Sequence, residues 1–106
     1  MSTEKPDTFS DAETFIDAHT EQGEPPLYKV LLLNDDFTPM EFVVDLIMRF
    51  FQKSLDDSVQ IMLHVHHQGV GLCGIYPREI AETKVMQVKQ YARGHAYPLS
   101  CRMEKN

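Results

Sequence analysis

Cysteine is scarce in this sequence: only Cys73 and Cys101 are present, and they stand far apart along the chain. Neither belongs to a CxxC pair, and no combination of cysteine and histidine has the spacing of a zinc site. A free cysteine packs as a small hydrophobic residue and stays reduced in the cytosol. We therefore expect two buried thiols and no cysteine-based metal centre.

Long hydrophobic runs are also missing. No apolar stretch approaches the roughly 20 residues that a membrane-spanning helix needs. The N-terminal residues, MSTEKPDTFSDAETF, lack the basic start and the apolar stretch of a signal peptide. The sequence therefore predicts a cytoplasmic protein without membrane contact, and its 106 residues are enough for one domain.

Basic residues are fewer than acidic ones: the sequence has ten lysines and arginines and 16 aspartates and glutamates, which gives a formal net charge of -6. The whole excess of negative charge lies in residues 1–26, which contain seven acidic residues, one lysine and few large apolar residues. This segment ends with the sequence GEPP. This composition is typical of a solvated segment. We expect a flexible acidic N-terminal arm at 1–26 and a folded core domain at 27–106. A nucleic-acid partner is disfavoured, because neither part offers the basic surface that phosphates require.

Residues 38–53 carry the clearest helix signals. Thr38 fits the N-cap, Pro39 the first helical position, and Glu41 completes a T-x-x-E capping box. The apolar positions repeat at helical spacing and comprise Phe42, Val43, Leu46, Ile47, Phe50 and Phe51. We therefore predict an amphipathic helix here, which follows an apolar strand, YKVLLL, at 28–33.

The remaining elements follow in regular order. A second helix at 56–68 has Asp56 as its cap and Gly69 beyond its end. The chain is completed by a strand at 71–76, a helix at 78–93 that Gly94 ends, and a strand at 98–104. The fold class is therefore α+β with the order β-α-α-β-α-β, in which a layer of helices packs on a small sheet.

Asn34, Asp35 and Asp36 stand between the first strand and the first helix. They could form an Asx-turn, bind Mg²⁺ or Ca²⁺, perform acid–base chemistry, or bind a cationic ligand. Thr38 and Glu41 already account for the helix cap, which leaves the three upstream groups free. The sequence has no EF-hand loop, HExxH motif or phosphate-binding glycine loop, and no motif in it indicates a catalytic nucleophile. The alternatives stay open, with cation binding favoured.

The second predicted helix contains HVHHQ, which supplies His64, His66 and His67. His64 and His67 are one turn apart and could hold a metal, although a solvated pair is the commoner outcome. His66 continues an apolar stripe, where a histidine usually bonds within the core, but a neutral imidazole can also accept a hydrogen bond. Core residues that could also line a pocket are Met40, Val43, Met62 and Val65. An apolar pocket with acceptors at its rim suits a ligand that is cationic at one end and hydrophobic at the other.

The motifs of residues 27–106 resemble those of one known family. The matching segments are NDDFTPMEFV (34–43), MLHVHHQG (62–69), CGIY (73–76), AETKV (81–85), YAR (91–93) and PLSC (98–101). Together they closely resemble ClpS, the bacterial adaptor that delivers N-end-rule substrates to the ClpA–ClpP ATP-dependent protease. The segments occur in order and with matching gaps, and Phe37 stands where many relatives have tyrosine.

This resemblance implies a fold and a ligand. The fold would be three helices packed on a three-stranded antiparallel sheet, similar to the C-terminal domain of the ribosomal stalk protein. The ligand would be the first residue of a substrate chain, with a free α-amino group and a Leu, Phe, Tyr or Trp side chain. By position, Asn34 and His66 would bond the ammonium group directly and Asp36 would do so through water. Asp35 would make the electrostatic potential at the ammonium group more negative, and Thr38 would contact the substrate backbone. The pocket would be lined by Met40, Val43, Met62, Val65 and Leu99.

The same resemblance implies a partner. The sequence has no nucleotide-binding loop and no activated nucleophile, so we predict an adaptor and not an enzyme, without catalytic residues, cofactor or metal. Its partner would be the N-terminal domain of a ClpA-type AAA+ unfoldase, contacted through Glu79 and Lys84, while the acidic arm reaches into the ATPase. The adaptor would modulate the specificity of the protease and would be a monomer when free. Two alternatives are a stalk-like interaction domain that does not recognise N-terminal residues and a small metal-dependent enzyme.

Overall fold

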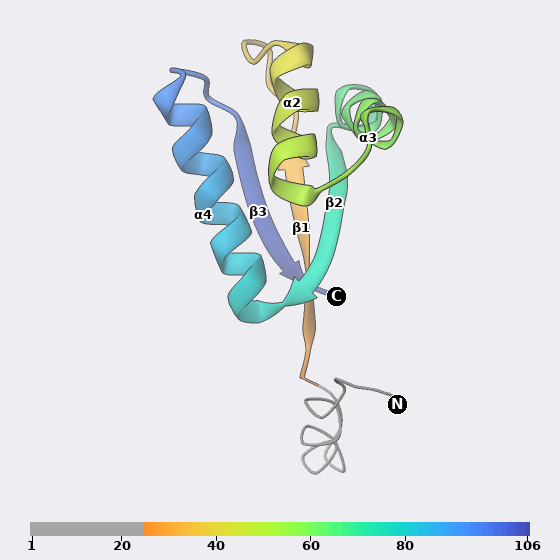
Figure 1. Ribbon diagram of the computed structural model, residues 1–106, viewed down its shortest axis with the longest axis vertical. Coiled ribbons are helices and arrows are strands. Elements are labelled where there is room, and N and C mark those ends of the chain that lie inside the picture. The colour runs from red at the N-terminus through yellow and green to blue at the C-terminus, as the bar shows by residue number, and fades with distance from the viewer. Residues whose placement is uncertain (1–24) are drawn as a thin grey trace, which may run out of the picture.

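The computed structural model describes residues 25–106, which form a three-stranded sheet with three helices on one face (Figure 1). The elements in chain order are β1 (Leu27–Leu33), α2 (Met40–Phe51), α3 (Leu55–Gln68), β2 (Val70–Pro77), α4 (Arg78–Gly94) and β3 (Ser100–Lys105). The predicted α+β class and the order β-α-α-β-α-β are therefore confirmed. The predicted arm at 1–26 lies outside the described residues, apart from Pro25 and Pro26. Within the described range, no helix combines the length and the apolarity that crossing a membrane requires.

β1 is the central strand of the sheet, whose order is β2-β1-β3. Both neighbours run antiparallel to it, and Leu33 at the end of β1 pairs with Val70 on β2 and with Ser100 on β3. The ladder to β2 has one irregularity, between Val30 and Leu31. This register places the end of β1 beside the end of α3. The candidate functional site lies at this position.

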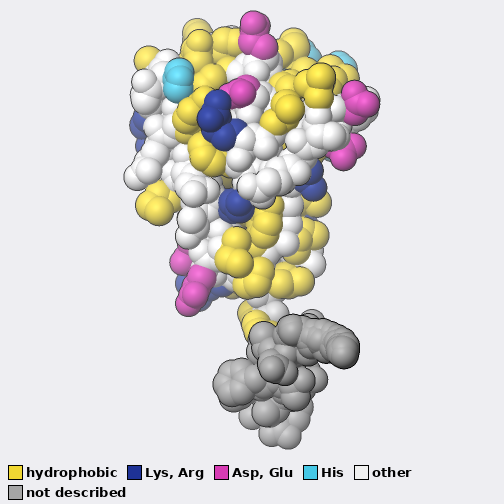
Figure 2. Space-filling model, in the orientation of Figure 1, with side chains coloured by type: hydrophobic (Ala, Val, Ile, Leu, Met, Phe, Trp, Pro, Cys, Tyr) yellow, Lys and Arg dark blue, Asp and Glu magenta, His cyan; other side chains and the backbone are white. Residues whose placement is uncertain are grey.

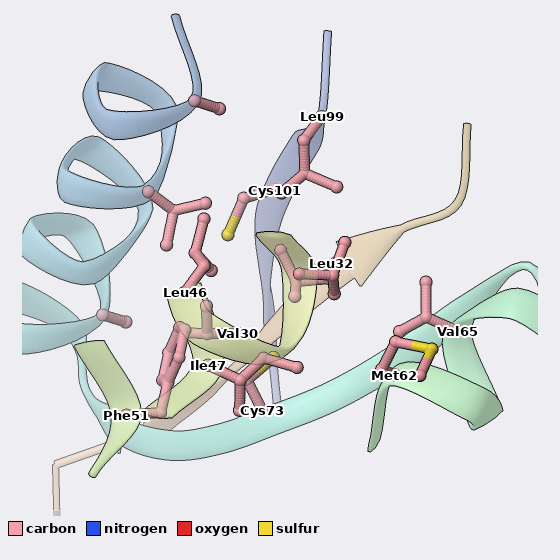
Figure 3. Packing of buried hydrophobic residues seen from close by; sticks show 14 residues of the cluster. Val30, Leu32, Leu46, Ile47, Phe51, Met62, Val65, Cys73, Leu99 and Cys101 are labelled. Atoms are coloured by element: carbon pink, nitrogen blue, oxygen red, sulfur yellow. The ribbon is translucent and has the colours of Figure 1, made fainter. Parts of the chain in front are cut away.

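The hydrophobic core lies between the sheet and the helices (Figure 3). Side chains alternate along a strand, so Val30 and Leu32 of β1 both point to the helical side, where each is 0 % exposed. Besides these two, the core contains Val43, Leu46, Ile47, Phe51, Met62, Val65, Cys73, Ala81, Val88, Ala92, Leu99 and Cys101. Figure 3 shows Met62 and Val65 at the α3 end of this cluster.

Both cysteines are buried, as predicted from the sequence. Burial raises the pKa of Cys73 to about 12, and the neighbouring Cys101 adds to the effect. Burial likewise raises the pKa of Cys101 to about 12. Because a thiol reacts through its thiolate, the two groups stay protonated at neutral pH and serve the core as packing groups.

The start of α2 differs from the prediction. The helix begins at Met40 after an extended Pro39, with ψ 145° and no side-chain cap, so the predicted capping box of Thr38 and Glu41 is wrong. The Thr38 hydroxyl donates instead to the Asp35 carboxylate at 2.8 Å. A hydrogen bond to a carboxylate is charge-assisted and therefore strong, and it holds the threonine side chain toward Asp35 and away from the helix N–H groups that it would cap.

The start of α3 also differs from the prediction. Its cap is Ser54, whose hydroxyl oxygen accepts from the Asp57 N–H at 3.1 Å, so the predicted cap at Asp56 is wrong. At the end of the same helix, Gly69 adopts the left-handed conformation that was predicted, with φ 89°. Gly94, in contrast, is the last residue of α4, and the left-handed residue beyond it is Ala96, with φ 62°.

Lys84 connects α4 with the end of α2. Its partly buried ammonium group donates to the carbonyl oxygen of Phe50 at 2.7 Å. The same group lies 5.9 Å from the ring centroid of Phe51 and 5.6 Å from that of Tyr76. The last carbonyls of a helix lack an intrahelical partner and carry the negative end of its dipole. Lys84 therefore stabilises the packing of α4 against α2.

We predict that Lys84→Met destabilises the domain by roughly 1 kcal/mol, because it removes this charge-assisted hydrogen bond and keeps most of the apolar stem. For a domain of this size the melting temperature should fall by about 4–8 °C, measured by circular dichroism. Lys89→Met replaces an exposed lysine on the same helix and serves as the control, with a change within about 0.5 kcal/mol. Equal melting temperatures of the two variants would contradict a stabilising role of Lys84.

Candidate functional site

The pairing of β1 with β2 brings together two segments that are far apart in sequence. Leu33 pairs with Val70, and the next backbone N–H, that of Asn34, donates to the Gly69 carbonyl oxygen at 2.9 Å. Gly69 ends α3 in a left-handed conformation that is free of strain for a residue without a Cβ. His66 stands in the last turn of α3. This hydrogen bond therefore places His66 beside the loop that follows β1.

A cavity of about 320 Å³ opens between this loop, the start of α2 and the end of α3. Hydrophobic side chains gather around acidic ones and histidine at this end of the molecule (Figure 2). The lining residues are Asn34, Asp35, Asp36, Phe37, Thr38, Pro39, Met40, Val43, Met62, Val65 and His66. All residues predicted to contact a ligand meet here except Leu99, which is 5 % exposed and packs in the core.

Asp35 shapes the loop. Its Oδ1 accepts from the backbone N–H groups of Phe37 and Thr38, each at 2.8 Å. The Thr38 hydroxyl completes the turn by donating to Oδ2 at 2.8 Å. Such an arrangement is an Asx-type turn, in which a side chain replaces a backbone acceptor. The expectation that all three polar residues of the loop are free is therefore wrong for Asp35, although its negative charge still lies at the cavity.

The rim of the cavity is rich in hydrogen-bond acceptors. Asn34, Asp36 and His66 are exposed and line the opening. An amide oxygen, a carboxylate and the unprotonated nitrogen of a neutral imidazole can all accept. Among the described residues that line the cavity there is no lysine or arginine, whereas Asp35 and Asp36 supply two carboxylates. The rim therefore suits a cationic group that carries N–H donors.

The floor of the cavity is apolar and belongs to the core. Val43, Met62 and Val65 are 6 %, 9 % and 3 % exposed. Met40, in contrast, is 47 % exposed and stands at the first position of α2. Gly71 on β2 allows the close approach of α3, because a Cβ at this position would lie 2.5 Å from Cγ2 of Val65. The floor is therefore rigid, while the methionine at the mouth is more exposed.

The remaining candidate residues do not line the cavity. His64 and His67 are exposed on α3, and within 25–106 no three histidine, cysteine, aspartate or glutamate side chains are grouped so that they could hold a metal ion. Glu79 is exposed in the first turn of α4. Lys84 is bonded to Phe50, as described above.

Phe37 and Pro39 line the cavity without having been predicted to do so. The signal that could have identified Phe37 is its position two residues after Asp35. In an Asx-type turn an aspartate accepts from the backbone N–H two residues further on, which here is that of Phe37. The closed turn leaves the Phe37 side chain outside, 77 % exposed.

Residues 23–102 of this chain match a family model described as "ATP-dependent Clp protease adaptor protein ClpS". The ATP-dependent Clp protease adapter protein ClpS of Brucella canis is 63% identical over 82 residues, which cover 77% of this chain and 71% of that protein. The ClpS of Caulobacter vibrioides strain NA1000 is 61% identical over 83 residues, which cover 78% of this chain and 76% of that protein.

A solved structure has the same fold. Agrobacterium tumefaciens ClpS2 bound to L-phenylalaninamide superposes with a TM-score of 0.76 at 36% identity. The match covers 78% of this chain and 100% of that chain. The family model spans most of the sequence, and the two relatives are more than 60% identical to it over about three quarters of its length. This chain therefore belongs to the ClpS family of ATP-dependent Clp protease adaptor proteins.

Proposed function

We propose that this adaptor binds the first residue of other polypeptides. The bound residue must have a free α-amino group and a Leu, Phe, Tyr or Trp side chain. The observation that carries the proposal is one cavity with the acceptors of Asn34, Asp36 and His66 at its rim and an apolar floor beneath them. The related ClpS2 of Agrobacterium tumefaciens supports it, because L-phenylalaninamide has a free α-amino group and an aromatic side chain.

The chemistry of an N-terminal residue matches the two parts of the cavity. An α-amino group has a pKa near 7.7–8.0, so at neutral pH it is mostly a cation with three N–H donors. Charge-assisted hydrogen bonds contribute about 1.5–3 kcal/mol each, and burial of a leucine or phenylalanine side chain adds about 1.5–3 kcal/mol. After the costs of association, a Kd in the micromolar range, near -8 kcal/mol, is expected.

Acetylation of the ligand's α-amino group tests this proposal most directly. Two fluorescent peptides that begin with leucine and differ only in N-terminal acetylation are titrated by anisotropy. The acetylated peptide should bind at least about 100-fold more weakly, because it loses the charge and two donors and leaves unpaired the acceptors that its binding removes from water. Equal affinities would refute the proposal.

A pair of histidine variants provides the matched control. His66→Ala removes an acceptor at the rim of the cavity, whereas His64→Ala removes an exposed histidine that does not line it. Only His66→Ala should weaken binding of the free-amine peptide. Both variants should keep the melting temperature of the parent protein, which separates loss of binding from loss of folding.

Selectivity among hydrophobic side chains is expected to depend on Met40. Its half-exposed side chain stands at the mouth of the cavity, where it would crowd a ligand branched at Cβ. We predict that Met40→Ala admits peptides that begin with isoleucine or valine, with a gain of about 10-fold or more, because a methyl misfit costs about 1–3 kcal/mol. Met48→Ala, an exposed methionine on the same helix, should leave discrimination unchanged. The ratio of Kd values for leucine and isoleucine peptides is the measurement, and an unchanged ratio in Met40→Ala would reject this role.

Delivery to the protease is the second part of the proposed function. The partner would be the N-terminal domain of a ClpA-type unfoldase, which Glu79 and Lys84 would contact at the first turns of α4. Glu79 supports this assignment by its exposure. Lys84 lies further along the same helix, and the bond from its ammonium group to the carbonyl oxygen of Phe50 also holds α4 in position.

The acidic residues 1–26 would engage the ATPase during delivery. We predict that deletion of residues 1–17 leaves peptide affinity unchanged and abolishes degradation of a reporter that begins with leucine, measured with purified ClpA and ClpP. A variant with the same 17 residues in scrambled order keeps length and charge and reports whether composition is sufficient. Degradation at the full rate after the deletion would show that these residues are dispensable.

A further inference from the structure

A second hollow adjoins the cavity on the other side of Phe37. Its volume is about 630 Å³, and it is lined by Phe37, Arg93, Ala96, Tyr97 and Pro98. Phe37 is the residue that the two hollows share, and 77 % of it is exposed. The Phe37 side chain is therefore available to a ligand on both of its sides.

The far wall of this second hollow is fixed by contacts within the domain. The ring of Tyr97 meets that of Phe42 edge-on, with centroids 4.7 Å apart, and the Tyr97 N–H donates to the Ala92 carbonyl oxygen at 2.9 Å. In Figure 1 the connection that leaves α4 ends near the loop that leads into α2. Since the wall is preformed, a side chain that binds there does not have to order it.

We propose, on the basis of the function proposed above, that the second hollow is a subsite for the third residue of the bound substrate. Side chains of an extended chain alternate, so those of the first and third residues point to the same side while the second points away. Two residues advance an extended chain by about 6.6 Å. This advance is comparable with the width of the single aromatic ring that separates the two hollows.

The lining of this subsite selects an aromatic side chain. Phe37 and Tyr97 contribute two aromatic residues to the lining, and aromatic pairs gain energy beyond that of buried area. Arg93 belongs to the same lining, and an arginine side chain can stack on an aromatic ring. The same charge repels lysine and arginine. A substrate with an aromatic third residue is therefore favoured over one with alanine or lysine at that position.

The test compares fluorescent pentapeptide amides that share an N-terminal leucine. Leu-Ala-Trp-Ala-Lys should bind about three- to tenfold more tightly than Leu-Ala-Ala-Ala-Lys, and Leu-Trp-Ala-Ala-Lys should show no such gain. The gain, taken as the ratio of Kd values within one variant, should shrink in Arg93→Ala and vanish in Phe37→Ala. Lys89→Ala, on the exposed side of the same helix, should retain it in full.

The subsite is overturned by equal affinity for the alanine and tryptophan peptides, or by an equal gain from tryptophan at the second position. A gain that survives in both Arg93→Ala and Phe37→Ala overturns it as well. Failure of the proposed function itself gives a different result. In that case Leu-Ala-Ala-Ala-Lys does not bind, or binds equally well after acetylation of its α-amino group.

Discussion

The site depends on the hydrogen bond from the Asn34 N–H to the Gly69 carbonyl oxygen, 2.9 Å long, which continues the β1–β2 ladder by one step. It joins the loop after β1 to the end of α3, although 35 residues separate the two positions in sequence. The two side chains that we expect to bond an ammonium group, those of Asn34 and His66, sit on either side of it. A sheet register that slips by one residue turns every side chain of the strand to the other face, so the packing of the core also fixes the geometry of the rim.

The floor of the cavity and the core of the domain are built from the same residues. Val43, Met62 and Val65 pack with the core cluster and also face the cavity. Interiors of proteins are close-packed, so these side chains cannot rearrange freely around different ligands. Compared with these three side chains, the half-exposed Met40 has more room to adjust to different ligands. A small domain can in this way combine a floor of fixed shape with one adjustable side chain at the mouth of the cavity.

The order of the elements and most members of the cavity could be predicted from the sequence, because apolar periodicity and the Asn34–Asp36 cluster are local signals, whereas Phe37 and Pro39 were not predicted. The helix caps could not be predicted in this way. A threonine before Pro39 fits the capping rules, in which its hydroxyl oxygen accepts from a backbone N–H, yet the hydroxyl donates to the Asp35 carboxylate at 2.8 Å, and only the path of the loop brings that carboxylate within reach. Leu99 shows the same limit, because its apolar character fits the pocket and the core equally well and the fold places it in the core.

The two proposed contacts of this adaptor lie at opposite ends of α2. The cavity opens beside Met40, the first residue of the helix, whereas Lys84 is bonded to Phe50 near its last residue. With a rise of 1.5 Å per residue, these positions are about 15 Å apart along the helix axis. A polypeptide whose first residue fills the cavity would therefore leave the first turns of α4 uncovered. Under the proposed function, a substrate and an unfoldase would then occupy different surfaces of the domain, as delivery requires.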